Sequence, residues 1–468
     1  MFNDKAEVPD VGASTQHIFD EGHRVGDLAQ TLFPHGLKVD TDDFGLNLDQ
    51  TKKLVLERRT LFEPGFLTDG IYSRLDILDP VGKDEWDIVE VKSSTKVKDE
   101  NIHDISFQRR CCERSGLKIR NCHLVHINNQ YIRHGNVEPG GLFTLEDVTD
   151  KVIDASTGIE DRIREMFKVI LQPEPPSVTI GSRCSEPYDC PVKSCWGGLP
   201  EYNVFQLYRG GKKCAELYAR GVQSLQAIPE DYNLNAQQRI QRTCAISRQP
   251  YFNAKAIDRF LSTLKYPLYY MDFETISLVI PLYDGTRPYQ RMPFQFSLHV
   301  VAAPGQAPVH YSYLAEGDGD PRPQFLAELR EHLGVAGSIV TYNGAFEKGV
   351  LTELGEAFLG FQDWVAATNV RVVDLLIPFR EFSYYHPEQK GSASIKHVLP
   401  ALTGRGYEGL DIAKGDDASL AFLQILSGEI SADAMLKIRE DLLKYCSLDT
   451  EAMILIIARL TSLALGAP

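Results

Sequence analysis

Three groups of polar residues, each joined to an apolar segment, limit most strongly how the second half of this 468-residue chain can fold. Asp272 and Glu274 end one apolar run, Glu347 follows another, and Tyr445 and Asp449 lie in a long C-terminal stretch of helical periodicity. Residues two apart on a strand share a face, as do residues four apart on a helix. These segments can therefore direct four carboxylates and one phenol into a single cleft.

The segments around these residues are expected to form an α/β domain. Three strands come first and are followed by alternating helix and strand, an order typical of layered α/β folds. Strands are expected at Leu268–Phe273, Phe294–Ala302, His310–Leu314 and Ile339–Tyr342, and helices at Pro323–Leu333, from Ala345, and at Ala432–Leu463.

Four carboxylates from three elements can bind two divalent metal ions about 4 Å apart, which clamp the attacking and leaving oxygens of a phosphodiester. The set resembles the DEDDy exonucleases, which have an RNase H-like fold. Asp272 and Glu274 match the first motif of that family, Glu347 the second, and Tyr445 with Asp449 the third. The resemblance implies that Tyr445 orients the attacking water. The family's second motif ends in Asp, so Glu347 is a departure, and a structural domain without catalysis is the alternative.

Two further segments are weaker candidates for the same cleft. Asp374 lies in the apolar run Val372-Val373-Asp374-Leu375 and is expected to line the cleft. Ser394-Ile395-Lys396 is expected to contact a phosphate.

The first half of the chain is expected to run strand, turn, strand, helix, strand after an N-terminal amphipathic helix over residues 16–35. The turn chemistry of residues 79–84 predicts a hairpin. The expected strands are Leu54–Leu67, Ile71–Leu78, Trp86–Lys92 and Cys122–Ile127, and the expected helix is Asp104–Ser115.

The hairpin places a second group of polar residues together. Glu90 and Lys92 share one strand face, while Val89 and Val91 face a core, and the hairpin brings Asp76 beside the pair. Carboxylates hold Mg²⁺ through hard oxygen ligands, and a lysine steadies the attacking water or the developing charge. A surface strand with alternating charges is the alternative.

This segment resembles the RecB-like branch of the PD-(D/E)XK nucleases. Asp76 and the triplet Glu90-Val91-Lys92 match the core motif, and Gln108 matches the glutamine of the following motif, whose tyrosine is replaced by Cys112. The resemblance implies a restriction-endonuclease-like domain that uses Mg²⁺ or Mn²⁺. His23 or Glu63 is expected to supply a further ligand.

Three of the nine cysteines, Cys184, Cys190 and Cys195, are clustered. Thiols at close spacing in a chain without an export signal indicate a metal site rather than disulfides. The RecB-like resemblance implies a 4Fe–4S cluster, with the fourth ligand either in a segment missing upstream of residue 1, the interpretation we favour, or at Cys214 or Cys244. A zinc site and three structural cysteines are the alternatives.

Composition adds a few limits. A net charge of −15 argues against a non-specific nucleic-acid coat, which is normally basic. The sequence contains neither a transmembrane run nor a signal peptide, so a cytoplasmic protein without membrane contact is expected. Protein partners are not indicated.

The sequence predicts three regions: a RecB-like domain over residues 1–200, a helical connector over 201–260, and a DEDDy-type domain over 261–468. The last region also resembles an uncharacterised bacterial domain family, through segments such as Asp272-Phe273-Glu274-Thr275 and Arg287-Pro288-Tyr289-Gln290. The expected function is a metal-dependent nuclease with two active sites that acts on DNA more than on RNA, at strand ends. The alternatives are a binding or assembly protein with degenerate sites and an RNA-processing exonuclease.

Overall fold

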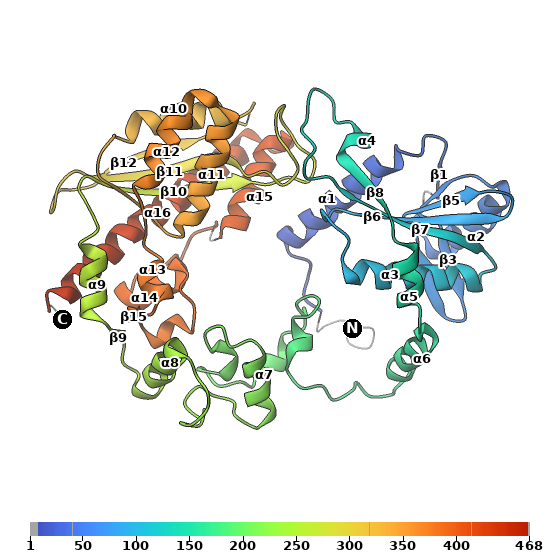
Figure 1. Ribbon diagram of the computed structural model, residues 1–468, viewed down its shortest axis with the longest axis horizontal. Coiled ribbons are helices and arrows are strands. Elements are labelled where there is room, and N and C mark those ends of the chain that lie inside the picture. The colour runs from blue at the N-terminus through green and yellow to red at the C-terminus, as the bar shows by residue number, and fades with distance from the viewer. Residues whose placement is uncertain (1–7, 40, 318, 413, 467–468) are drawn as a thin grey trace. The chain divides into compact units, whose positions relative to one another are not determined.

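The computed structural model describes residues 8–39, 41–317, 319–412 and 414–466. The chain is mixed α/β and forms two compact units (Figure 1). The N-terminal unit consists of residues 10–178 together with 277–290, and the C-terminal unit of residues 179–276 and 291–466 with the described residues 8 and 9. None of the helices formed by the described residues has the length and apolarity needed to span a membrane.

The N-terminal unit is built on a six-stranded sheet with the order β1-β2-β5-β6-β7-β8. β5 and β6 form an antiparallel hairpin, and β6 pairs with β7 in parallel. The elements are α1 (Ala13–Gln30), β1 (Leu37–Lys38), α2 (Phe44–Leu54), β2 (Leu61–Phe62), β3 (Gly65–Thr68), β4 (Ile71–Arg74), β5 (Ile77–Val81), β6 (Glu85–Lys92), α3 (Asp99–Arg114), β7 (Lys118–Ile127), α4 (Pro139–Leu142), β8 (Phe143–Asp147), α5 (Thr149–Ala155) and α6 (Ile159–Ile170).

Helices cover both faces of this sheet, and β6 alternates between the two cores. Ile88 packs in the core that contains α3 and α5, and Val89 packs in the core that contains α1. Val91 packs against the α1 core, as predicted. Glu90 and Lys92 continue the face of Ile88, on which α3 lies.

The hairpin prediction is confirmed for β5 and β6, but the expected strand Ile71–Leu78 is divided between β4 and β5, which lie in different sheets. The expected strand Leu54–Leu67 is wrong. That stretch contains the end of α2, a short 3₁₀ turn and the two short strands β2 and β3. Helix α2 begins after Asp43, whose side chain accepts a hydrogen bond from the Leu46 amide, and it ends near two lysines. This N-cap and these basic residues in the last turn are signals for a helix.

The C-terminal unit is built on a five-stranded sheet with the order β12-β11-β10-β13-β14. β10, β11 and β12 are antiparallel neighbours, whereas β13 and β14 run parallel to β10. The elements that surround the sheet are β10 (Leu268–Ile276), β11 (Met292–Val301), β12 (Val309–Leu314), α10 (Arg322–His332), β13 (Ser338–Thr341), α11 (Gly344–Ala357), α12 (Gln362–Val370), β14 (Val372–Asp374), α13 (Ile377–Arg380), α14 (Ile395–Thr403), α15 (Gly415–Ser427) and α16 (Ala432–Ala464).

The two faces of β10 have different neighbours. Phe273 contacts Phe325 of α10, with the ring centroids 5.0 Å apart. Leu268 and Tyr270 lie in a core formed largely with α14 and α16. Asp272 and Glu274 continue the second face, so they point toward α16. The strands and helices expected here are confirmed to within a few residues.

Residues 201–260, expected to be a helical connector, are helical only in part. They contain α7 (Lys212–Ala219) and α8 (Ala236–Ser247), and the remainder up to β9 (Tyr251–Phe252) is turns and extended chain. α9 (Ala254–Leu261) follows, and β9 pairs with β15 (Tyr384–Tyr385). The cysteine segment lies before α7 and belongs to the C-terminal unit.

Residues 277–290 leave the C-terminal unit between β10 and β11 and pack into the N-terminal unit. Val279 is buried in the α1 core of that unit. Arg133 holds the segment: its Nη1 donates to the carbonyls of Pro281 (2.9 Å) and Leu282 (2.6 Å), and its backbone amide donates to the Thr286 carbonyl (3.0 Å). Each unit is therefore discontinuous in sequence.

Candidate catalytic and metal-binding sites

Asp272 and Glu274 lie on the central strand of the C-terminal sheet and face α16. Their registered partners on β11 are Ser297 and Gln295. Asp272 Oδ2 lies 3.6 Å from the thiol of Cys446 on α16. Among the described residues, the one group of three metal-ligand atoms within 4.8 Å of one another is formed by Asp272, Glu274 and Cys446.

Helix α16 is fastened across this face by polar contacts. The side-chain amide of Gln295 donates to the Leu442 carbonyl at 2.8 Å, and the Thr450 hydroxyl lies 2.7 Å from the Ser297 hydroxyl and 2.8 Å from His299 Nδ1. These contacts fix the helical phase that turns Asp449 toward the strand.

Tyr445 and Asp449 lie one turn apart on α16, as predicted, and both are buried. The Tyr407 hydroxyl donates a hydrogen bond to Asp449 Oδ1. Lys396 Nζ donates to the Tyr445 hydroxyl at 3.1 Å and lies 5.1 Å from the centre of the Tyr445 ring. A cation and two phenols therefore surround the carboxylate.

Glu347 is in the first turn of α11 and is 1% exposed. Its Oε2 has no hydrogen-bond partner in the part of the chain that the structure describes. The turn before it is tight, because a Cβ at Gly344 would lie 2.9 Å from the Thr341 hydroxyl and 3.1 Å from Val372. The fold thus holds a buried carboxylate oxygen that residues 8–39, 41–317, 319–412 and 414–466 leave without a hydrogen-bond donor.

The negative charges of these carboxylates repel one another. Burial raises the pKa of Asp272 well above its usual value, and the charge of Asp449 raises it further. Burial, followed by the charge of Asp272, likewise raises the pKa values of Glu274 and Glu347. The pKa of Asp449 is raised by burial although Tyr407 hydrogen-bonds to it. A site that disfavours its own negative charge in this way is suited to a cation.

In the N-terminal unit, Glu90 lies at the centre of a hydrogen-bonded group between β6 and α3. Lys92 Nζ donates to Glu90 Oε1 at 2.6 Å, and Gln108 Nε2 donates to Glu90 Oε2 at 2.8 Å. Lys92 also contacts Asp104 Oδ2 at 3.2 Å. The structure thus brings together three of the predicted residues and adds Asp104.

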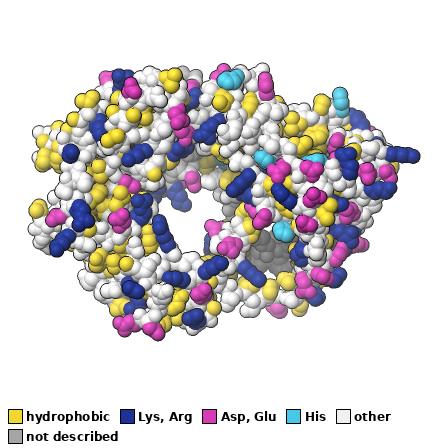
Figure 2. Space-filling view, viewed as in Figure 1, with side chains coloured by type: hydrophobic (Ala, Val, Ile, Leu, Met, Phe, Trp, Pro, Cys, Tyr) yellow, Lys and Arg dark blue, Asp and Glu magenta, His cyan; other side chains and the backbone are white. Residues whose placement is uncertain are grey.

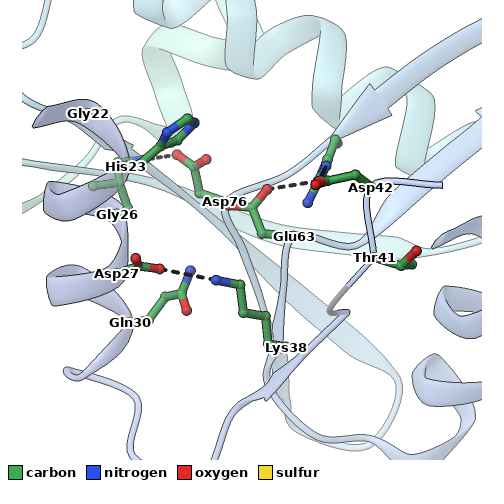
Figure 3. A pocket seen from close by; sticks show the side chains of 12 residues that line it. Gly22, His23, Gly26, Asp27, Gln30, Lys38, Thr41, Asp42, Glu63 and Asp76 are labelled. Atoms are coloured by element: carbon green, nitrogen blue, oxygen red, sulfur yellow. Dashed lines mark hydrogen bonds and ion pairs between the residues drawn. The ribbon is translucent and has the colours of Figure 1, made fainter. Parts of the chain in front are cut away.

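Asp76 lies directly before β5, and its Oδ2 accepts a hydrogen bond of 2.6 Å from the Val91 amide. It lines a polar cavity of about 520 Å³ together with His23 and Glu63, both expected as candidate further ligands (Figure 3). Glu63 is paired with Arg74 at 2.9 Å. The residues that line the cavity are Gly22, His23, Gly26, Asp27, Gln30, Lys38, Thr41, Asp42, Glu63, Arg74, Asp76 and Val91.

Asp76 and Glu90, the two acidic residues that the hairpin brings together, also repel each other when both are charged. Burial raises the pKa of Asp76 to about 6. Burial, and then the charge of Asp76, raises the pKa of Glu90 to about 8. Burial lowers the pKa of Lys92, but the charge and hydrogen bond of Glu90 outweigh this and leave it raised.

The cysteines expected to bind a cluster are close in sequence and loosely arranged. The Cys190 amide donates to the Cys184 carbonyl at 2.8 Å, and Cys195 is exposed. Within the described part of the chain, their sulfurs form no group of ligand atoms within 4.8 Å. Cys214 and Cys244, the candidate fourth ligands, are buried in two apolar clusters. A cluster or zinc ion here stays a prediction.

The two weaker candidates have different roles. Asp374 Oδ1 accepts hydrogen bonds from the amides of Asn343 and Leu376, both at 3.0 Å, and the bond from Asn343 anchors the turn before α11. Lys396 contacts Tyr445, whereas Ser394 caps α14 without a side-chain hydrogen bond.

The sequence interpretation missed Asp104, Tyr407 and Cys446. Asp104 precedes Gln108 by four residues on α3, and Cys446 precedes Asp449 by three residues on α16, so helical phase could have identified both. Tyr407 lies in a loop far from Asp449 in sequence, and no local pattern marks it.

Residues 269–394 match a family described as a domain of unknown function (DUF2779). The expected likeness to an uncharacterised domain family is confirmed over this range. The matched range contains Asp272, Glu274 and Glu347, together with the segment 277–290, and ends before Tyr445. A comparison with curated proteins finds no match.

Proposed function

We propose that this protein is a metal-dependent nuclease with two separate active sites, which hydrolyses phosphodiester bonds of DNA, at strand ends. The observation that carries the proposal is the group of buried carboxylates on β10, α11 and α16, in which Glu347 Oε2 has no hydrogen-bond partner among the described residues. Carboxylate oxygens are the ligands that Mg²⁺ and Mn²⁺ prefer.

The residues present fit divalent metal ions at the C-terminal site. Asp272, Glu274, Glu347 and Asp449 would hold them, and their raised pKa values reflect a negative charge that bound cations would stabilise. When bound, such ions polarise the phosphate and lower the pKa of a coordinated water.

The strand order of the C-terminal sheet supports an RNase H-like fold. Three antiparallel strands lie at one side, and two strands parallel to β10 lie at the other. The hairpin, the parallel pair β6–β7 and the helix α3 between them similarly support a PD-(D/E)XK fold for the N-terminal unit.

The protein's own residues have distinct tasks in this proposal. Tyr445 orients the attacking water, and Lys396 holds the Tyr445 hydroxyl at 3.1 Å. In the N-terminal unit, Asp76 and Glu90 are the metal-binding carboxylates, Gln108 orients Glu90, and the Lys92 ammonium stabilises charge on the phosphate.

The test uses end-labelled single- and double-stranded DNA and RNA with Mg²⁺ or Mn²⁺. Wild type is compared with Lys92→Ala, Asp272→Ala and the double variant. We expect metal-dependent degradation, with each single variant losing one component of it. Loss of all cleavage in Asp272→Ala with the fold intact would contradict two independent sites.

Two observations favour a second candidate function, a nucleic-acid-binding or assembly role with a degenerate exonuclease site. Glu347 replaces the Asp of the DEDDy pattern, and Tyr407 occupies one oxygen of Asp449. DNA-end binding that needs no metal, with no cleavage under any divalent ion, would favour this role over the nuclease.

A further inference from the structure

A basic pocket lies directly beyond Lys92 in the N-terminal unit. It has a volume of about 410 Å³ and is formed by the loop after β6, the loop after β7 and the segment 277–290. The residues that line it are Ser94, Thr95, Lys96, Lys98, Asn129, Arg287, Pro288 and Tyr289.

The pocket is built from segments that are tied together. The Ile127 amide donates to the Ser94 carbonyl at 2.9 Å, which holds the first loop against β7. The Tyr289 hydroxyl donates to the carbonyl of Ser93, the neighbour of Lys92. Tyr289 has a φ of 60°, a conformation that costs energy for a bulky side chain and that its surroundings must enforce.

The pocket is lined by basic residues, whereas the chain as a whole carries a net negative charge. Acidic residues outnumber basic ones by 64 to 49, and Figure 2 shows both signs interspersed on the face in view. Among the described residues that line the pocket, Lys96, Lys98 and Arg287 are basic and none is acidic. Lys98 reaches Glu100 at 3.6 Å, and Lys96 is exposed.

An aromatic ring stands beside these cations. Tyr289 is 37% exposed, while its hydroxyl is engaged with the backbone. Cations that contact phosphates, combined with an accessible ring on which a base can stack, are the features that bind single-stranded nucleic acid. A paired base inside a duplex cannot stack on a side chain in this way without leaving its helix.

We propose that this pocket binds the backbone of a single strand of nucleic acid, with a base stacked on Tyr289 and adjacent phosphates on Lys96 and Arg287. The site would hold the strand next to Lys92, so the inference rests on the nuclease function proposed above and specifies its substrate as unpaired. The segment that supplies Tyr289 and Arg287 continues directly from the strand that carries Asp272 and Glu274.

The experiment measures binding without cleavage. Fluorescein-labelled dT20, U20 and a blunt 20-base-pair duplex, each about 20 nucleotides per strand to span one site, are titrated with full-length protein in Ca²⁺, and affinity is followed by anisotropy over a salt series. The test variant is Lys96→Gln with Arg287→Gln. The matched control is Lys83→Gln with Lys168→Gln, which removes two exposed lysines from the same unit, one at the opposite end of β6.

We expect the test variant to bind dT20 and U20 at least tenfold more weakly and to reduce the salt slope by about 1.4, since each phosphate contact contributes about 0.7 for a single strand. The control variant should bind as wild type does, and the duplex should bind more weakly than either single strand. Tyr289→Leu should weaken binding about fivefold or more, whereas Tyr289→Phe should keep the ring and the affinity.

Equal affinity of the test and control variants for single strands would overturn the proposal. So would a wild type that prefers the duplex, or one that binds no probe. Failure of the nuclease function is a separate result, because a wild type that binds single strands through this pocket but cleaves nothing with Mg²⁺ or Mn²⁺ would refute only the catalytic proposal.

Discussion

Lys396 donates a hydrogen bond of 3.1 Å to the hydroxyl of Tyr445, and its ammonium lies over the rings of both Tyr445 and Tyr407. Lys396 is the second residue of α14 and Tyr445 lies on α16, so the contact joins two helices beside the cluster of carboxylates. It fixes the direction of the phenol that we propose orients water.

We expect Lys396→Gln to slow cleavage at the C-terminal site about ten- to hundredfold, because a hydrogen bond from a charged donor contributes about 1.5–3 kcal/mol. Lys396→Arg should recover most of the rate. Single-turnover rates in the Lys92→Ala background measure this site alone. A glutamine variant as fast as the arginine variant would show that the contact is only structural.

Glu347 provides a second test of the carboxylate site. Glu347→Asp should retain metal-dependent cleavage, whereas Glu347→Gln should lose about a hundredfold or more, since a metal ligand accounts for several kcal/mol of charge stabilisation. The rates are measured over a Mn²⁺ titration, which separates weaker metal binding from slower chemistry. A fully active glutamine variant would remove Glu347 from the site.

The raised pKa values predict how stability depends on pH. Folded carboxyl groups with raised pKa values keep their protons while the unfolded groups have lost theirs, so the metal-free protein loses stability as pH rises. The window extends from about pH 4, the ordinary range of carboxyl groups, through the pKa of about 6 for Asp76 to that of about 8 for Glu90.

Thermal unfolding in EDTA at several pH values checks this prediction. The melting temperature should fall by several degrees between pH 5 and pH 8, and an excess of Mg²⁺ should reverse the fall. A melting temperature that rises over this range in EDTA would contradict it.

Arg133 should be the main anchor of residues 277–290. Arg133→Ala removes the side-chain hydrogen bonds to Pro281 and Leu282 and should cost about 1–3 kcal/mol of unfolding free energy. The freed segment should then be cut faster by chymotrypsin at Tyr283. Arg162→Ala, which loses two similar hydrogen bonds to the carbonyls of Ala155 and Thr157, is the control and should leave this cleavage unchanged.

Local sequence patterns predict the elements that stand out as apolar runs or as long helical repeats. β6 and β10 are buried on both faces and read as short apolar runs, and α16 shows helical periodicity, so all three follow their expected limits closely. The stretch from Leu54 departs from its expected strand because its apolar residues suit either a strand or a helix, and the capping residue Asp43 ahead of it favours the helix.

The candidate sites were predictable where their residues are spaced along one element, as Glu90 with Lys92 and Tyr445 with Asp449 are. Contacts between distant segments were not. Tyr407 contacts Asp449 from a loop, and Tyr289 contacts Ser93, which lies far from it in the sequence. Such pairings depend on tertiary packing, which no local spacing specifies.

The insertion of residues 277–290 into the N-terminal unit has a consequence for how the gene can be divided. A protein cut after residue 178 would yield one fragment whose core lacks Val279 and another whose β10–β11 loop exposes apolar side chains that are normally buried. Neither half can therefore be expected to fold properly without the other. Recombination that separates the two halves of the gene would disrupt both units. We expect the two candidate activities to be inherited as a single unit.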